Sequence, residues 1–287
     1  MNLLIKTLLA ISILFACSDK KTSLKTIKNI KLEKLWETDT LLNDVESVIY
    51  DTNNNVLYTS NINGHWLKKN GKGFISKVGL QGNILQHKWL EQLEGPTGSA
   101  IDGNTLYVAD FNTVVAIDIP TQNIIKKYLI EGTERINDLT IDANGIIYGT
   151  DSKRGVLFSL NNGKTSLLKT DIEWPNGVLY EKDALLIGLG DKTIEKFQLN
   201  NNTATTMATG ISNPDGIIRI CNGNYLISSW EGMIYYVTKE GDKKLLLDSR
   251  KENINAADMT YIPSLKMLIV PAMLHNKLIA YKVNYEL

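Results

Sequence analysis

The sequence contains few of the features that mark several large protein classes. Its only two cysteines are Cys17 and Cys221, and no disulfide framework remains if Cys17 is lipidated, as argued below. Six prolines and no low-complexity tract argue against a disordered chain. Basic and acidic side chains number 31 each, so the chain lacks the clustered positive charge expected of a nucleic-acid-binding protein. After residue 20 no apolar run approaches the roughly 20 residues of a membrane span, so we expect a soluble body.

The N-terminal residues differ from this body. A start carrying one charge, Lys6, precedes the apolar run Thr7 to Ala16, as in a secretory signal peptide. The ending Leu14-Phe15-Ala16-Cys17 resembles the lipobox of bacterial lipoproteins, in which the signal is cut before the cysteine and the cysteine is acylated. A plain secretory signal with an incidental cysteine is the alternative. The pattern therefore predicts a protein of the bacterial cell envelope, held to the membrane by lipid and facing the periplasm or the cell surface.

Three segments follow from this reading. Residues 1–16 are the predicted signal peptide. Residues 17–35 hold the lipidated Cys17 and a polar, lysine-rich tether. Residues 36–287 are the predicted folded domain.

The folded domain consists of similar units. Each unit has a polar start, a short strand pattern, a turn rich in Asn, Asp or Gly, and a second strand pattern. The units begin at Val45, Pro96, Ile136, Pro175, Pro214 and Ala257. A period of about 40 to 50 residues with several strands per unit is typical of a β-propeller with four-stranded blades.

Six units predict an all-β, six-bladed propeller, which closes on itself and so leaves no long sheet edge exposed. A β-sandwich is the rival fold, but it does not require six similar units at even spacing. We expect the segment Ile30 to Trp36 to add an outer strand to the last blade and lock the ring. A monomer is expected.

Each unit carries a polar residue at the same step of its first strand. Because the first strands of all blades line the central channel, these side chains are expected to form a ring at one mouth of it. They are Glu46, Thr97, Asn137, Asn176, Asp215 and Asp258. Carboxylates packed this closely repel one another, and oxygen ligands without His or Cys suit a hard divalent cation. The alternative is that Asn176-Gly177 and Asp215-Gly216 are only turn residues, and that Arg135 pairs with Glu134 at the surface.

Three motifs stand at blade spacing: Arg135-x-Asn137-Asp138, Pro175-Asn176-Gly177 and Pro214-Asp215-Gly216. Through them the chain resembles the gluconolactonase/regucalcin (senescence marker protein) family of six-bladed propellers over roughly residues 40 to 285. The resemblance implies one divalent metal, with Ca²⁺ favoured and Mg²⁺, Mn²⁺ or Zn²⁺ as alternatives. It implies Glu46, Asn176 and Asp215 as the metal ligands, and Arg135 and Asn137 as substrate-binding residues.

The function expected on this basis is a metal-dependent hydrolase of a small-molecule lactone or ester, with Asp215 as the general base. Further channel residues are expected at Thr97, Asp138 and Asp258. The alternative is a non-catalytic propeller lipoprotein that binds a ligand or a protein and keeps a structural metal in the channel. The only membrane contact expected is the lipid anchor.

Overall fold

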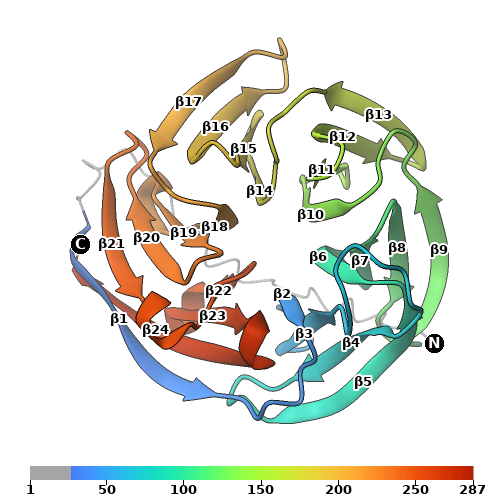
Figure 1. Cartoon of the computed structure of the whole chain (residues 1–287), viewed down its shortest axis with the longest axis horizontal. Coiled ribbons are helices and arrows are strands. Elements are labelled where there is room, and N and C mark those ends of the chain that lie inside the picture. The colour runs from blue at the N-terminus through green and yellow to red at the C-terminus, as the bar shows by residue number, and fades with distance from the viewer. Residues whose placement is uncertain (1–26, 287) are drawn as a thin grey trace, which may run out of the picture.

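The computed structural model describes residues 27–286, which form 24 strands in six four-stranded sheets. The sheets stand around a central channel in chain order (Figure 1). The predicted six-bladed propeller is therefore confirmed. No helix of the described residues is long and apolar enough to span a membrane. The predicted signal peptide at 1–16 and lipidation at Cys17 lie outside the described residues and stay predictions.

The first three blades have the same construction, with antiparallel neighbours in chain order from the channel outwards. Blade 1 comprises β2 (Val45–Asp51), β3 (Val56–Asn61), β4 (Gly73–Val78) and β5 (Ile84–Leu93). Blade 2 comprises β6 (Pro96–Asp102), β7 (Thr105–Asp110), β8 (Thr113–Asp118) and β9 (Asn123–Leu129). Blade 3 comprises β10 (Ile136–Ile141), β11 (Ile147–Asp151), β12 (Val156–Asn161) and β13 (Lys164–Lys169).

The last three blades complete the ring. Blade 4 comprises β14 (Val178–Glu181), β15 (Ala184–Gly188), β16 (Thr193–Gln198) and β17 (Ala204–Thr209). Blade 5 comprises β18 (Pro214–Arg219), β19 (Tyr225–Ser229), β20 (Met233–Val237) and β21 (Lys243–Asp248). Blade 6 comprises β22 (Thr260–Ile262), β23 (Met267–Ala272), β24 (Lys277–Glu286) and β1 (Lys28–Glu37). Four short 3-10 helices lie in connections: η1 (Cys221–Gly223), η2 (Arg250–Glu252), η3 (Pro263–Leu265) and η4 (Met273–His275).

The ring is closed by strands from both ends of the chain. β1 pairs antiparallel with β24, from Lys28 opposite Glu286 to Glu37 opposite Ile279, and Figure 1 shows β1 along the outer side of blade 6. The closing strand expected at Ile30 to Trp36 is thus present. It begins at Lys28, so the boundary expected at residue 36 falls inside a strand, because Ile30, Leu32 and Trp36 pack against the hydrophobic core.

The hydrophobic core lies between neighbouring blades. One buried cluster, for example, joins Ala109 and Val114 of blade 2 to Leu139 and Phe158 of blade 3. Every residue of β3, β11, β15, β19 and β23 is buried, whereas all but one residue of β9 is exposed. Burial therefore falls from the second strand of a blade to its rim, and the apolar faces of the blades hold the inner strands in place around the channel.

The closing strand provides a stability test. Ile30 is 3% exposed and belongs to a buried cluster that also contains Tyr236 and Val283, whereas Leu35 on the same strand is 47% exposed. We expect Ile30→Ala to lower the free energy of unfolding by about 2–5 kcal/mol. Leu35→Ala should change it by less than about 0.5 kcal/mol. Urea unfolding measures both, and an equal effect of the two variants would show that β1 does not belong to the cooperative fold.

Candidate functional site

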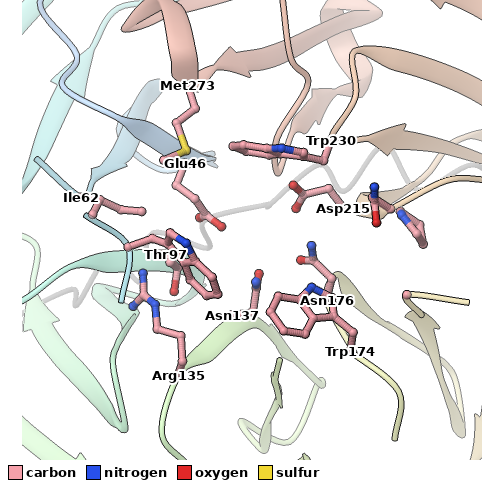
Figure 2. Close-up of a pocket in the computed structure, with 14 residues that line it drawn as sticks. Glu46, Ile62, Thr97, Arg135, Asn137, Trp174, Asn176, Asp215, Trp230 and Met273 are labelled. Carbon is pink, nitrogen blue, oxygen red and sulfur yellow. The ribbon is translucent and has the colours of Figure 1, made fainter. Parts of the chain in front are cut away.

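A pocket of about 370 Å³ opens at the end of the channel where the inner strands begin. Its polar side chains include five of the six residues predicted to form a ring: Glu46, Thr97, Asn137, Asn176 and Asp215. Arg135 lines it as well. Figure 2 shows the side chains of Glu46, Asn137, Asn176 and Asp215 directed towards one centre. The structure therefore brings together the three predicted metal ligands and the two predicted substrate-binding residues.

Irregular pairing at the start of the inner strands aims these side chains at the pocket. The register between first and second strand slips between Val45 and Ser47, Pro96 and Ser99, Ile136 and Leu139, and Pro214 and Ile217. Glu46, Thr97, Asn137 and Asp215 fall inside these slips, whereas Asn176 stands two residues before β14, whose pairing is regular. Because a β-bulge leaves residues out of the ladder and redirects them, a strand can begin with polar groups that face the channel before its apolar face starts.

Three glycines that follow ring residues allow the next blade to approach. A Cβ atom on Gly177 would lie 1.6 Å from the carbonyl oxygen of Asp215, and one on Gly98 would lie 2.5 Å from Cα of Asp138. On Gly216 it would lie 2.7 Å from the amide nitrogen of Met259. None of the three glycines has a positive φ. Packing between blades, and not a left-handed turn, explains these glycines, which weighs against the turn-only interpretation of Asn176-Gly177 and Asp215-Gly216.

Hydroxyl groups fix the backbone around the two motifs. Thr150 and Ser152 of blade 3 donate hydrogen bonds to the carbonyl oxygens of Asn176 and Pro175, at 2.5 and 2.7 Å. In blade 5 the amide of Gly216 donates to Oγ of Ser228 at 2.8 Å. Within the two motifs these bonds use backbone groups only, so they leave the side chains of Asn176 and Asp215 available to the pocket.

The three predicted metal ligands each present an oxygen without a partner. Oε2 of Glu46, Oδ1 of Asn176 and Oδ1 of Asp215 are buried and accept no hydrogen bond. A buried polar atom left unsatisfied costs about 1–3 kcal/mol, so three around one pocket call for a ligand. Carboxylate and amide oxygens are the donors that Ca²⁺ and Mg²⁺ take, and the residues therefore fit a hard divalent ion. Within residues 27–286 no three His, Cys, Asp or Glu side chains are grouped so that they could hold a metal ion. The predicted ligands Glu46, Asn176 and Asp215 differ from such a group because one of the three is an amide.

The electrostatics of the site favour a cation. Burial, together with the charges of Asp215 and Asp258, raises the pKa of Glu46 well above its usual range. Burial and the charge of Asp258 do the same to the pKa of Asp215, and burial raises the pKa of Asp258 to about 7. The charge of Arg135 opposes the shift at Glu46 but does not offset it. A divalent cation at the unsatisfied oxygens would stabilise the ionised carboxylates.

Arg135 is buried beside this group at 2% exposure. Its Nη1 donates to the carbonyl oxygen of Gly95 at 2.7 Å, and its guanidinium lies 4.6 Å from the centroid of the Phe111 ring. Its Nη2 is buried without a partner. The surface pair suggested for Arg135 is wrong, because Glu134 lies 3.0 Å from Arg154 instead. The unsatisfied Nη2 leaves one donor for a ligand in the pocket.

The three further channel residues lie in different places. Thr97 lines the pocket, and its hydroxyl donates to the carbonyl oxygen of Ile136 at 3.0 Å. Asp138 does not line it: its carboxylate accepts the amides of Leu139 and Val178, both at 2.7 Å. Asp258 does not line it either. The backbone amide of Asp258 donates to the carbonyl oxygen of Glu46, and its bridge partner is Ser47, one residue further along β2. Asp138 therefore positions blade 4, and Asp258 acts on the site through its charge.

The repeat pattern did not predict the apolar residues of the pocket. Ile62, Trp66, Trp174, Trp230 and Met273 all line it. The rings of Trp66 and Trp174 meet edge to face, with centroids 5.9 Å apart. One signal was available, because Trp174 directly precedes Pro175-Asn176-Gly177 and Trp230 directly follows the second strand of its unit. Both therefore belong to the loops at the mouth.

The packing at Gly177 gives a test of how the site is built. We expect Gly177→Ala to lower the free energy of unfolding by more than Gly103→Ala. A Cβ on Gly103 meets no atom within 4 Å, but its φ of +55° costs roughly 1–2 kcal/mol for any other residue. Gly177→Ala should also weaken divalent-ion binding, because it displaces the backbone of Asp215. Urea unfolding and calorimetric Ca²⁺ titration of both variants measure this; equal stability losses would contradict the packing argument.

Comparisons with known proteins support the fold. Neither a protein-family profile nor a curated protein matches the sequence. Among solved structures, a provisionally assigned gluconolactonase has a TM-score of 0.68 at 13% identity, covering 90% of this chain and 93% of its own. A streptogramin B lyase has a TM-score of 0.66 at 13% identity, covering 89% and 98%. An inactive variant of virginiamycin B lyase from Staphylococcus aureus, with quinupristin, has a TM-score of 0.63 at 12% identity, covering 89% and 100%. The chain thus has the propeller fold of a gluconolactonase-like protein and of these lyases.

Proposed function

We propose that the protein is a metal-dependent lactone or ester hydrolase that binds one divalent cation, with Ca²⁺ favoured, through Glu46, Asn176 and Asp215. The observation that carries the proposal is the set of three buried, unsatisfied oxygens that these residues present to one pocket. Two carboxylates match the charge of a divalent ion, and the amide adds an oxygen without adding charge.

A divalent ion held there would supply Lewis-acid polarisation of a carbonyl oxygen. Side chains of the protein would accept the proton and orient the substrate. Asp215 has a second carboxylate oxygen with which to accept the proton of an attacking water, as a general base. Arg135 would orient the substrate through Nη2, which is buried and has no protein partner. Asn137 lines the pocket from the bulge of blade 3 and would add an amide to the same substrate oxygens.

A non-catalytic propeller with a structural metal is the second candidate, because an ion bound to the same oxygens would also relieve the repulsion between the carboxylates. The pocket of about 370 Å³ beside these oxygens supports a site that admits a small molecule. Measurement of turnover separates the two candidates.

Metal binding by the protein can be measured directly. The purified protein should bind about one Ca²⁺ per chain, and a chelator should lower its unfolding temperature, because an ion bound only by the folded state stabilises that state. Glu46→Gln, which removes one charge from the donor set, should weaken Ca²⁺ binding at least tenfold in calorimetric titration. Glu91→Gln is the matched control, since Glu91 only pairs with Lys88 on the surface. Ca²⁺ binding unchanged by Glu46→Gln would count against this donor set.

The role of Asp215 as the general base can be tested by substitution. Asp215→Asn keeps the shape of the side chain and one oxygen but removes the proton acceptor, so turnover at saturating Ca²⁺ should fall at least ~10²-fold. Asp39→Asn, at an exposed position, should leave it unchanged. The substrates are sugar lactones, alkyl lactones and aryl esters, and ¹⁸O uptake from labelled water distinguishes hydrolysis from elimination.

Two results of that experiment would change the proposal. Activity that survives Asp215→Asn would keep the hydrolase and remove Asp215 as its base. A folded, Ca²⁺-loaded protein that converts none of these substrates would favour the non-catalytic binding propeller.

A further inference from the structure

Apolar side chains surround the polar side chains of the pocket, with Ile62 and Trp174 on opposite sides of them in Figure 2. We call Ile62, Trp66, Trp174, Trp230 and Met273 the apolar wall; the first four lie in loops, Met273 begins η4, and all five lie outside the inner strands. In the view of Figure 2, Trp174 and Trp230 flank the polar side chains of Asn176 and Asp215. We call Glu46, Asn137, Asn176 and Asp215 the polar centre. A ligand that reaches the polar centre from the mouth must therefore pass along indole rings.

Trp174 has a backbone conformation that is unusual for a bulky residue. Its φ is 47°, in the left-handed region, which a bulky side chain rarely adopts. Phe111 has a similar φ of 58°, but its ring is 6% exposed and packs against the guanidinium of Arg135. Trp174, in contrast, remains 45% exposed. Trp174 thus combines a strained backbone conformation with an indole that stays half-exposed in the pocket.

The neighbours of Trp174 hold it at the mouth. The amide of Gly190 donates to the carbonyl oxygen of Glu173 at 3.1 Å, and a Cβ on Gly190 would lie 2.8 Å from Cβ of Trp174. The indole of Trp174 also meets that of Trp66 at an interplanar angle of 72°. The two rings form a corner with two apolar faces.

The apolar wall offers little to a polyhydroxylated ligand. Asn213, which also lines the pocket, already donates from its side-chain amide to Oε1 of Glu231 at 2.9 Å. Sugar hydroxyls placed against the faces of the indole rings or against Met273 would lose water there without gaining ordinary hydrogen bonds in return. An alkyl or aryl group would instead remove apolar surface of both partners from water.

We propose that the substrate of this pocket is a lactone or ester with a substantial alkyl or aryl group, which packs on the apolar wall while the carbonyl group meets the polar centre. A polyhydroxylated sugar lactone is a poor fit. The inference rests on the proposed function for the carbonyl end only, since the apolar wall would bind such a molecule with or without chemistry.

Lactams resist hydrolysis, so they test binding apart from turnover. We would measure calorimetric affinities of the Ca²⁺-loaded protein for δ-valerolactams carrying propyl, pentyl or heptyl chains at the ring carbon next to nitrogen, and for the polyhydroxylated glucono-δ-lactam. Each added methylene buried on the apolar wall should tighten binding about fourfold until the pocket is full. The heptyl lactam should bind at least tenfold more tightly than the sugar lactam. Affinity independent of chain length, or tighter binding of the sugar lactam, would overturn the inference.

Variants locate the contact. Trp174→Ala and Trp230→Ala should each weaken binding of the heptyl lactam at least tenfold while leaving the affinity for Ca²⁺ unchanged. Trp36→Ala, which removes the same side chain from β1 outside the pocket, is the matched control and should bind the lactam like the wild type. Thermal unfolding of each variant confirms that it is folded. Unchanged lactam binding by both pocket variants would contradict the role of the apolar wall.

The two proposals can fail separately. Lactam binding as expected, without turnover of any lactone or ester, would support the apolar wall and refute the hydrolase. Turnover confined to sugar lactones would support the hydrolase and refute the alkyl or aryl specificity.

Discussion

The burial of like charges at the channel mouth is the constraint on which the site depends. Glu46 and Asp215 are 6% and 2% exposed, and Asp138 and Asp258 are near enough for their charges to add to the cost of ionising Glu46. The core between the blades brings these groups together, because it fixes where each inner strand begins. A ring of blades that concentrates carboxylates at its axis is compatible with a stable fold only when a cation or protons offset the charge.

Two local devices allow the blades to converge. The bulges take the polar residues out of the pairing ladder, so the strands behind them can still bury apolar faces. The glycines after Thr97, Asn176 and Asp215 let each following blade come closer than any side chain would permit. The buried guanidinium of Arg135 makes several contacts in little space. It donates to the carbonyl oxygen of Gly95, packs on the ring of Phe111, and has one nitrogen, Nη2, without a protein partner.

Much of this could be predicted from the repeats. Six units at even spacing predicted six blades, and the polar residue at the start of each unit predicted Glu46, Asn137, Asn176 and Asp215 in one pocket. The spacing could not exclude Asp138 from the pocket, because a bulge in β10 decides which of two successive residues faces it, and it could not exclude Asp258, because that residue bridges to Ser47 of the neighbouring blade. The apolar wall escaped for another reason: its residues come from loops of unequal length, which follow no period and whose place is set by the packing of whole blades.

The pairing of β1 with β24 has a consequence for the order in which the protein takes shape. Lys28 and Glu286 face each other from opposite ends of the chain, so the ring cannot close until the last strand has left the ribosome. Until then β24 is not available to pair with β1, and blade 6 cannot fix the amide of Asp258 against the carbonyl oxygen of Glu46 in blade 1. Such long-range contacts form slowly because a large loop must close before they add stability. The complete ring around the site therefore forms late, when β1 and β24 meet.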